Sequence, residues 1–316
     1  KKLEKGIPIN LLSKQAIVKM LFSRSYDSGN IVIPKIMILK VIIVNYNGAQ
    51  FIKSCFDSIV SQFKFFPDFS ILVIDNASTD ESLQLLEDYE DHITLIKNNV
   101  NVGFPMAHNQ VIDLLDTPYI WLLNNDTEFD HTTDIISPIM AYLNANPDVV
   151  GLSPKLLNTD GTLQSQGSGF NRYRFRSKKI IQVPFLSGAS LFIRTQFFKD
   201  MNGFDPHLFF YNDDVDFALQ AKKHRKRLIY YPSIEITHHG GLSTKFEPVK
   251  TTIGGYYGSI YLCKKYYPKP IFLVYYYLVR LLIDLKTLYH KIVPSPLSDE
   301  WIMELKKIKD KLKNEI

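Results

Sequence analysis

Short apolar runs rich in β-branched residues alternate with stretches of helical spacing over residues 38–156. Such alternation is typical of βα units, whose strands form a parallel sheet that is buried on both faces. We therefore predict an α/β fold for this part of the chain. The apolar runs are KVIIVNY, FSILVID, ITLIK, YIWLLN and VVGLSP, and the helical stretches are 49–63, 80–90, 104–116 and 130–145.

The alternation stops at residue 157. Residues 157–182 are polar, contain three glycines and end in a basic run, which indicates a hairpin or a mobile loop. Beyond them, VPFLSGASLFIR and LIYYPSIEITHH predict two more strands, and a helix is expected to begin near Asp213. Ser78 and Glu81 have the spacing of a capping box, which predicts the start of the second helix.

The chain divides into three segments by composition. Residues 1–36 contain a basic stretch of helical spacing, and we interpret them as an N-terminal extension, from a preceding segment of a longer protein or a leader onto this one. Residues 37–250 carry the α/β pattern. Residues 251–316 begin with many tyrosines, continue with the apolar stretch PIFLVYYYLVRLLIDL and end in a lysine-rich amphipathic tail, so we predict C-terminal helices.

The apolar stretch of the C-terminal segment has more than one interpretation. Arg280, Asp284 and Lys286 interrupt it, and a membrane-spanning helix needs about 20 apolar residues. An interfacial membrane helix, a dimer-forming helix and a packed helical cap all remain open. The first of these would place the protein on the inner face of the plasma membrane.

The overall composition is that of an ordinary globular protein. The 316 residues are 46% hydrophobic and 22% charged, with a net charge of +5. The positive excess fits anionic substrates or an anionic membrane surface, and alone it does not indicate nucleic acid. The two cysteines, Cys55 and Cys263, cannot form a disulfide framework, and the first 30 residues lack a signal-peptide pattern, so a cytoplasmic location is expected.

Polar clusters rich in Asn and Asp follow four successive predicted strands. Each cluster alone could be turn or cap chemistry, because Asn and Asp favour both. In open α/β sheets, however, ligands bind at the carboxyl ends of the strands, which brings the four clusters to one edge. Together they predict a ligand site. The clusters are NYNG (45–48), DNASTD (75–80), NNVNVGF (98–104) and NNDTE (124–128).

The chain lacks the common glycine-rich phosphate cradles. Neither G-x-G-x-x-G after the first strand nor G-x-x-x-x-G-K-[ST] occurs in it. A diphosphate could still bind if Mg²⁺ or Mn²⁺ neutralised it, and these cations prefer oxygen ligands. Asp126 is the best candidate ligand. His238 or His239 could supply a nitrogen, although a histidine at a strand end can equally be structural.

Three carboxylates stand among aromatic residues in the stretch FFYNDDVDF. One reading is a helix start, with Asp213 and Asp216 at N-cap to N3 spacing and the acidic charge stabilised by the helix dipole. The other is a general base, because burial among aromatics and neighbouring negative charge both raise a carboxyl pKa. Under that reading one of the three carboxylates takes the proton, and the stretch alone leaves open which one.

The ordered motifs together resemble glycosyltransferase family 2 of the GT-A fold, especially its bacterial rhamnosyltransferase-like branch. The resemblance covers roughly 38–250. It implies an α/β fold with a Rossmann-like nucleotide-binding half, a mixed central sheet and C-terminal helices. The motifs are VIIVNYNG, LVIDNASTDES, NNVNVGFPMAHN, WLLNNDTEF, GFDPHLFFYNDDVDFALQAKK and ITHHGGLST.

The resemblance also implies an activity. Family members transfer a sugar from a nucleotide-diphosphate donor by an inverting single displacement that uses Mn²⁺ or Mg²⁺. By branch, the donor would be dTDP-rhamnose or a UDP-sugar. The acceptor would be a hydroxyl of a glycan or lipid-linked molecule in bacterial surface polysaccharide synthesis.

Site residues can be carried over by motif. Asp214 corresponds to the proposed general base, preceded by Asp213, which leaves Asp216 structural or orienting. Asp126 with His238 would hold the metal. Asp75 would meet the base or ribose, and Asn101, Gly103 and Asn109 match a loop and helix that close over the nucleoside. The remaining nucleotide-site residues are Asn45, Tyr46, Asn47, Asn76, Ser78, Asn124 and Asn125.

This chain departs from the family pattern at two places. Asn124 stands at the first acidic position of the D-x-D metal motif, which puts metal affinity in question. After the helix with Asp214, the chain has KHRKRL where relatives often have Gly, and Gly is the usual left-handed residue at a helix end. We expect only a local difference there.

Other functions remain open at this point. A nucleotidyltransferase of similar fold would have a Gly- and Arg-rich loop after the first strand, which NYNGAQFIKS does not provide. A non-catalytic sugar- or metal-binding module would not need Asp214. The basic run is either a flexible flap over phosphate or a solvated loop, and its charged residues are Arg172, Arg174, Arg176, Lys178 and Lys179.

Overall fold

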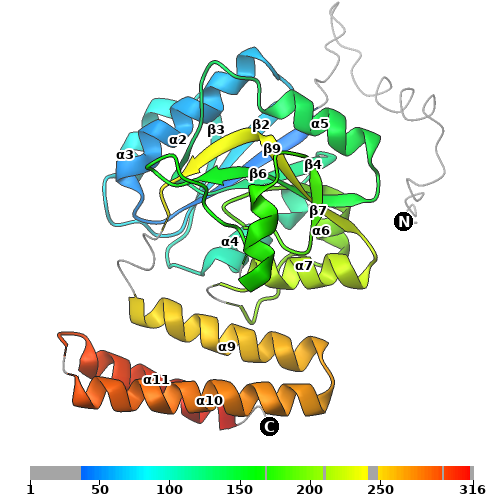
Figure 1. Ribbon diagram of the computed structural model, residues 1–316. Coiled ribbons are helices and arrows are strands. Elements are labelled where there is room, and N and C mark those ends of the chain that lie inside the picture. The colour runs from blue at the N-terminus through cyan, green and yellow to red at the C-terminus, as the bar shows by residue number, and fades with distance from the viewer. Residues whose placement is uncertain (1–36, 168, 209–210, 241–247, 294, 314–316) are drawn as a thin grey trace, which may run out of the picture. The chain divides into compact units, whose positions relative to one another are not determined.

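The computed structural model describes residues 37–167, 169–208, 211–240, 248–293 and 295–313 (Figure 1). The expectations for the extension at 1–36 lie outside the described residues. The described residues fold around one nine-stranded sheet with helices on both faces, followed by C-terminal helices (Figure 1).

The first half of the sheet is parallel, as the alternating pattern predicts. Its strand order is β3-β2-β1-β4, and Asn45 at the end of β1 is level with Asp75 at the end of β2. The intervening helices are shorter than predicted after β2 and β3, where turns of 3₁₀ helix continue them. The elements are β1 (Leu39–Asn45), α2 (Ala49–Ser61), β2 (Phe69–Asp75), α3 (Ser82–Leu86), β3 (Ile93–Lys97), α4 (Phe104–Asn109) and β4 (Tyr119–Leu123).

The second half of the sheet is mixed. β8 pairs antiparallel with both β4 and β6, whereas β6 and β9 run parallel, and the short strands β5 and β7 pair antiparallel with β9. The mixed central sheet is thus confirmed. The elements are β5 (Thr127–Glu128), α5 (Ile136–Ala145), β6 (Val149–Leu157), β7 (Ile181–Val183), β8 (Ser190–Arg194), α6 (Thr195–Asp200), α7 (Asp213–Lys223) and β9 (Arg227–His238).

Two apolar cores hold the sheet in place, one on each face. Alternate residues of a strand point to opposite faces, so Val41 of β1 belongs to one core and Ile42 to the other. Phe56 of α2 packs in the first core, and Phe217 of α7 in the second. Because both strands and helices are fixed by buried side chains, the loops at the carboxyl ends of the strands start from a rigid frame.

The capping-box prediction for the second helix is wrong, whereas the helix expected near Asp213 is present without the cap pair that one reading gave it. α3 begins at Ser82 without a capping box, because the Ser78 hydroxyl is 3.0 Å from both Asn45 Nδ2 and the Asn47 amide nitrogen. α7 begins at Asp213 itself, so the N-cap is Asn212, which has φ 70°. Asp213 and Asp216 therefore do not form a cap pair.

The polar region after β6 is an ordered hairpin followed by a short helix. Leu157 bridges to Leu163, and the 3₁₀ helix η5 (Gly169–Arg176) is anchored by the buried ring of Phe175. At the end of α7, Arg225 adopts φ 55° where Gly is usual, which is the local difference expected there.

The chain ends in helices that have a core of their own. α9 (Pro248–Tyr266), α10 (Lys269–Ile292) and α11 (Ser298–Lys313) pack together around Tyr276, Ile283, Trp301 and Leu305. The predicted C-terminal helices are therefore present. Among the described residues, no helix combines the length and apolar character that crossing a membrane requires.

Candidate active site

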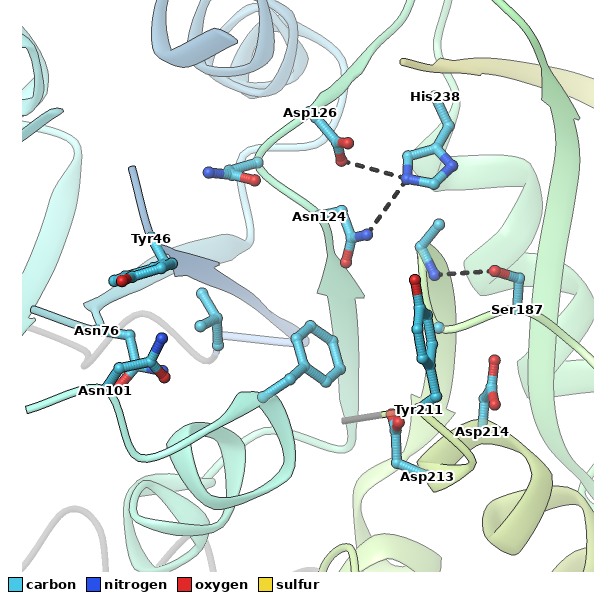
Figure 2. Close-up of a pocket in the computed structure, with 15 residues that line it drawn as sticks. Tyr46, Asn76, Asn101, Asn124, Asp126, Ser187, Tyr211, Asp213, Asp214 and His238 are labelled. Atoms are coloured by element: carbon cyan, nitrogen blue, oxygen red, sulfur yellow. Dashed lines mark hydrogen bonds and ion pairs between the residues drawn. The ribbon is translucent and has the colours of Figure 1, made fainter. Parts of the chain in front are cut away.

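A pocket opens where β1 and β4 end, facing the start of α7 (Figure 2). Tyr46, Asn76 and Asn101 lie on one side of it, and Asp213 with Asp214 on another (Figure 2). It therefore combines the strand-end clusters with the acidic helix start, which are far apart in sequence. The complete lining is Val44, Tyr46, Asn76, Asn101, Phe104, Asn124, Asn125, Asp126, Ser187, Gly188, Ala189, Tyr211, Asp213, Asp214 and His238.

Asn45 connects the strand-end loops by hydrogen bonds and lies outside the pocket lining. Its Nδ2 donates to Asp75 Oδ1 at 2.9 Å, and its Oδ1 accepts from Asn125 Nδ2 at 2.7 Å. Asp75 is buried and also accepts from the Ser78 amide at 3.0 Å. Asn47 Oδ1 accepts from the Thr79 amide. These predicted nucleotide-site residues support the lining loops, and only Asn125 among them reaches the lining.

A second polar network orders the loop after β3. Asn76 Nδ2 donates to Asn101 Oδ1 at 2.8 Å, and the same oxygen accepts from the Gly103 amide at 2.9 Å. Gly103 has φ 84°, a conformation that favours glycine, just before α4. Asn109 lies elsewhere. Both atoms of its amide bond the backbone of Phe204, so it ties α4 to the segment before α7.

Asp126 and His238 lie next to each other on a third side of the pocket (Figure 2). His238 Nδ1 is 2.7 Å from Gln164 Oε1, an oxygen that only accepts, so Nδ1 carries the proton in the neutral ring. The lone pair of Nε2 therefore faces Asp126 Oδ1 at 3.2 Å and can also accept from Asn124 Nδ2 at 3.3 Å. That carboxylate oxygen is buried and has no hydrogen-bond partner, while Oδ2 accepts from the Gly240 amide.

This donor set fits a divalent cation. The lone pairs of His238 Nε2 and Asp126 Oδ1 face each other, so a cation between them would be attracted by both. Without such a partner, burial of the carboxylate oxygen costs free energy. No group of three or more His, Cys, Asp and Glu side chains that could hold a metal occurs among the described residues. Mg²⁺ and Mn²⁺ commonly bind through one or two protein groups together with substrate phosphates, which suits Asp126 and His238.

The two adjacent histidines have different surroundings. His239 Nε2 lies 3.5 Å from Glu128, and its ring packs on Phe51 with a centroid separation of 4.8 Å. It is absent from the pocket lining, whereas His238 is part of it. Of the two alternatives, His238 is thus the one that faces the site.

Asp213 and Asp214 stand at the first two positions of α7, after a strained turn. Tyr211 and Asn212 both have positive φ, 62° and 70°, which non-glycine residues rarely adopt and which clusters at functional sites. Burial raises the pKa of Asp213, and the negative charge of Asp214 raises it further. Burial also raises the pKa of Asp214, against the opposing effect of backbone N–H groups, including that of Gly188.

The other carboxylate of the acidic stretch points away from the pocket. Asp216 is buried and accepts hydrogen bonds from Lys265 Nζ at 2.8 Å and from the Tyr266 hydroxyl at 2.6 Å. It therefore has an orienting contact with α9, as one of the sequence interpretations has it. None of the basic residues proposed as a phosphate flap is in the pocket lining, and Arg172 and Arg176 instead lie over the ring of Tyr173.

Several residues at the site were not identified from the sequence. Ser187, Gly188 and Ala189 precede β8 and form the wall beside Asp214, where they join Phe104 and Tyr211, two aromatic residues of the predicted motifs. Gln164 holds His238, and Gln166 Oε1 accepts from the Ser187 amide at 3.2 Å. Both glutamines come from the polar hairpin after β6. Because that segment has no apolar periodicity, the sequence does not indicate where their side chains lie.

The family model for glycosyl transferase family 2 matches residues 40–201, which is half of the chain. The matched range includes the four strand-end clusters and ends before the acidic helix start. The pocket residues Asp213, Asp214 and His238 thus lie outside the matched range, and their placement rests on the structure.

Two curated relatives share less than a third of their aligned residues with this chain. An N-acetylglucosaminyl-diphospho-decaprenol L-rhamnosyltransferase of Mycobacterium tuberculosis is 23% identical over 226 residues, covering 61% of this chain and 73% of the relative. A teichoic acid poly(glycerol phosphate) polymerase of Staphylococcus epidermidis is 29% identical over 130 residues, covering 36% of this chain but only 18% of the relative. The chain thus matches a small part of one relative and most of the other.

A solved structure shares the fold over nearly the whole chain. A mannosyltransferase from Pyrobaculum calidifontis in complex with GDP-Man and Mn²⁺ superposes with a TM-score of 0.55 at 14% identity, covering 92% of this chain and 90% of that one. The predicted GT-A fold with C-terminal helices is confirmed by this likeness.

Proposed function

The chain belongs to glycosyl transferase family 2, and we propose that it transfers a sugar from a nucleotide-diphosphate donor to a hydroxyl of a glycan or lipid-linked acceptor in bacterial cell-envelope polysaccharide synthesis. The observation that carries this proposal is the pocket itself. It places a polar strand-end surface, the Asp126–His238 pair and the ionisable Asp214 around one space (Figure 2).

The nucleoside would lie over Tyr46, Asn76 and Asn101. The ring of Tyr46 is 45% exposed, so it offers a flat surface to a base, and the amides of the two asparagines offer donors and acceptors. Their mutual hydrogen bond fixes both side chains before a ligand arrives, which lowers the ordering cost of binding. By the branch of the resemblance, dTDP-rhamnose or a UDP-sugar is the proposed donor.

Asp126 and His238 would hold Mn²⁺ or Mg²⁺ together with the donor diphosphate. When bound, the cation supplies positive charge to the phosphate oxygens of the leaving group. Gln164 keeps the His238 lone pair directed at that position, and the Gly240 amide fixes Asp126. Asn124 leaves Asp126 as the acidic ligand of the NND motif, so His238 would supply a second, uncharged ligand atom.

Asp214 would act as the general base. The acceptor O–H bond breaks as its oxygen bonds the anomeric carbon, the proton goes to the carboxylate, and the bond from the anomeric carbon to the diphosphate oxygen breaks with its electron pair. Attack on the side opposite the leaving group inverts the anomeric configuration. Burial makes Asp214 a stronger base than an exposed aspartate, because it raises the pKa.

The proposal is tested by a panel of nucleotide sugars with the purified 316-residue chain. Each is measured for its effect on the melting temperature with and without Mn²⁺, since a ligand stabilises the state it binds. We expect one donor to raise the melting temperature in a Mn²⁺-dependent manner and to release nucleoside diphosphate when an acceptor is added. Release of pyrophosphate would identify a nucleotidyltransferase instead, and binding of no nucleotide sugar would contradict the proposal.

A further inference from the structure

The outward face of α10 is entirely apolar or aromatic. Its residues recur every three or four positions and cover an arc of about 140° around the helix. Each is between 52% and 68% exposed, and no charged residue lies within the arc. The members of this outward face are Ile271, Val274, Tyr277, Leu278, Leu281, Leu282, Leu285, Leu288, Tyr289 and Ile292.

The opposite face of α10 already supplies the core of the C-terminal helices. Phe272, Tyr276, Val279 and Ile283 are buried there against α9 and α11. The helix is therefore apolar on both faces, and the outward face is not needed for the fold of the described residues. A contiguous apolar surface of this extent is uncommon on a protein without a partner at that place.

Positive charge lies along one edge of the outward face. Residues 248–313 contain twelve Lys and Arg residues but five Asp and Glu residues, an excess larger than the +5 of the whole chain. On α10 itself, Lys269, Arg280 and Lys291 follow each other at intervals of about three helical turns and so line one edge of the face. The acid near that edge, Asp284, is paired with Lys309 of α11.

We propose that the outward face of α10 docks onto an anionic lipid surface. Apolar side chains would enter the boundary between headgroups and acyl chains, while the edge cations meet lipid phosphates. Tyr277 and Tyr289 suit this location, because tyrosine is enriched at membrane interfaces. Since the other face of α10 is buried in its own helical core, the helix axis would lie parallel to the surface.

Charge and width favour lipid over a second copy of the chain. A two-stranded coiled coil uses a narrow seam of two positions in seven, flanked by charges of both signs. The outward face is wider, with Tyr277, Leu282 and Tyr289 beside the seam positions. A symmetric dimer would also bring two surfaces of the same positive sign together, which is unfavourable.

Vesicle flotation of the 316-residue chain tests this inference. We expect it to float with vesicles of equal parts phosphatidylcholine and phosphatidylglycerol, and far less with phosphatidylcholine alone. The double variant L281E/L285E should lose at least tenfold in binding. L114E is the matched control, because Leu114 is 50% exposed on the α/β part of the chain, and it should bind like the wild type. K269Q/K291Q should lose about fivefold per lysine.

The other outcomes would overturn the inference. Equal flotation of wild type and L281E/L285E would remove α10 from the contact. A wild type that does not float but sediments as a dimer, with a monomeric L281E/L285E variant, would assign the face to a second copy. Circular dichroism and donor binding should be unchanged in all variants, so loss of flotation is separable from misfolding and from failure of the proposed transfer activity.

Discussion

Lys265 Nζ on α9 lies 2.8 Å from Asp216 Oδ1 on α7, two residues after Asp214. The same ammonium group is 2.7 Å from Asp205, and the Tyr266 hydroxyl donates to Asp216 as well. The C-terminal helices are therefore bonded through a nearly buried carboxylate to the helix that carries the proposed base. Burial works to raise the pKa of Asp205, but hydrogen bonds from Lys265 and its other partners outweigh it and hold that pKa below its usual range.

Replacing Lys265 should loosen this connection. K265M leaves two carboxylates with one fewer cation, so we expect a loss of about 1–3 kcal/mol in the free energy of unfolding. Transfer should also slow while the donor Kd stays unchanged, because α7 is held less firmly. Urea unfolding and single-turnover kinetics measure the two effects. K222M, at an exposed lysine on α7, is the control, and an equal response of both variants would count against the connection.

The rate of transfer should depend on pH in the acid range. Asp214 must be ionised to accept a proton, and burial holds its pKa above the ordinary value of about 3.9. Lowering the pH protonates it, so kcat/KM should fall with a midpoint clearly above pH 4. Donor binding measured over the same range separates this from loss of the metal site. A midpoint at or below pH 4 would show that the base is an ordinary exposed carboxylate.

The buried negative charge of Asp213 should lower the free energy of unfolding at neutral and alkaline pH. Its pKa is raised in the folded state, so its contribution is favourable below the unfolded pKa and is lost as the pH rises through the folded pKa. D213N removes the buried charge and should gain about 1–3 kcal/mol at about pH 8, with the gain vanishing near pH 4. Urea unfolding at both pH values measures this. D113N changes an exposed carboxylate and should show no such difference.

Gln164 should affect the affinity for the cation, although its side chain would not bind the cation directly. Q164L removes the acceptor that fixes the His238 tautomer, and loss of such a partner typically weakens metal binding about 10–100-fold. The electron paramagnetic resonance signal of free Mn²⁺, titrated in the presence of the nucleoside diphosphate, reports this without catalysis. Q182L, at an exposed glutamine on β7, should leave the affinity unchanged. Unaltered affinity in Q164L would remove His238 from the proposed ligand set.

Much of the fold was predictable because its signals are local. Buried strands such as β1 and β4 read as continuous apolar runs, and the Asn and Asp residues that follow them stand at fixed places in the chain. The meeting of Asp126 with Asp214 in one pocket required the resemblance, because 88 positions separate them and no local pattern links them.

The features that could not be predicted from the sequence depend on tertiary contacts. Ser78 has the spacing of a cap, yet its hydroxyl serves Asn45 and Asn47, since a buried polar group on the adjacent loop competes for it. Gln164 and Gln166 look like ordinary loop residues until the hairpin brings them to His238 and Ser187. The partner of Asp216 lies about 50 residues away on α9, where no periodicity indicates it.

The role of Asp214 as the base of a sugar transfer can be tested by comparing D214N with the wild type in two assays. Asn keeps the size and the hydrogen bond from the Val215 amide but cannot accept the proton. We expect transfer to fall about 10²–10⁴-fold while the Kd for the donor with Mn²⁺ stays within about twofold. Transfer that persists in D214N, or donor binding that is lost together with it, would rule out Asp214 as the base.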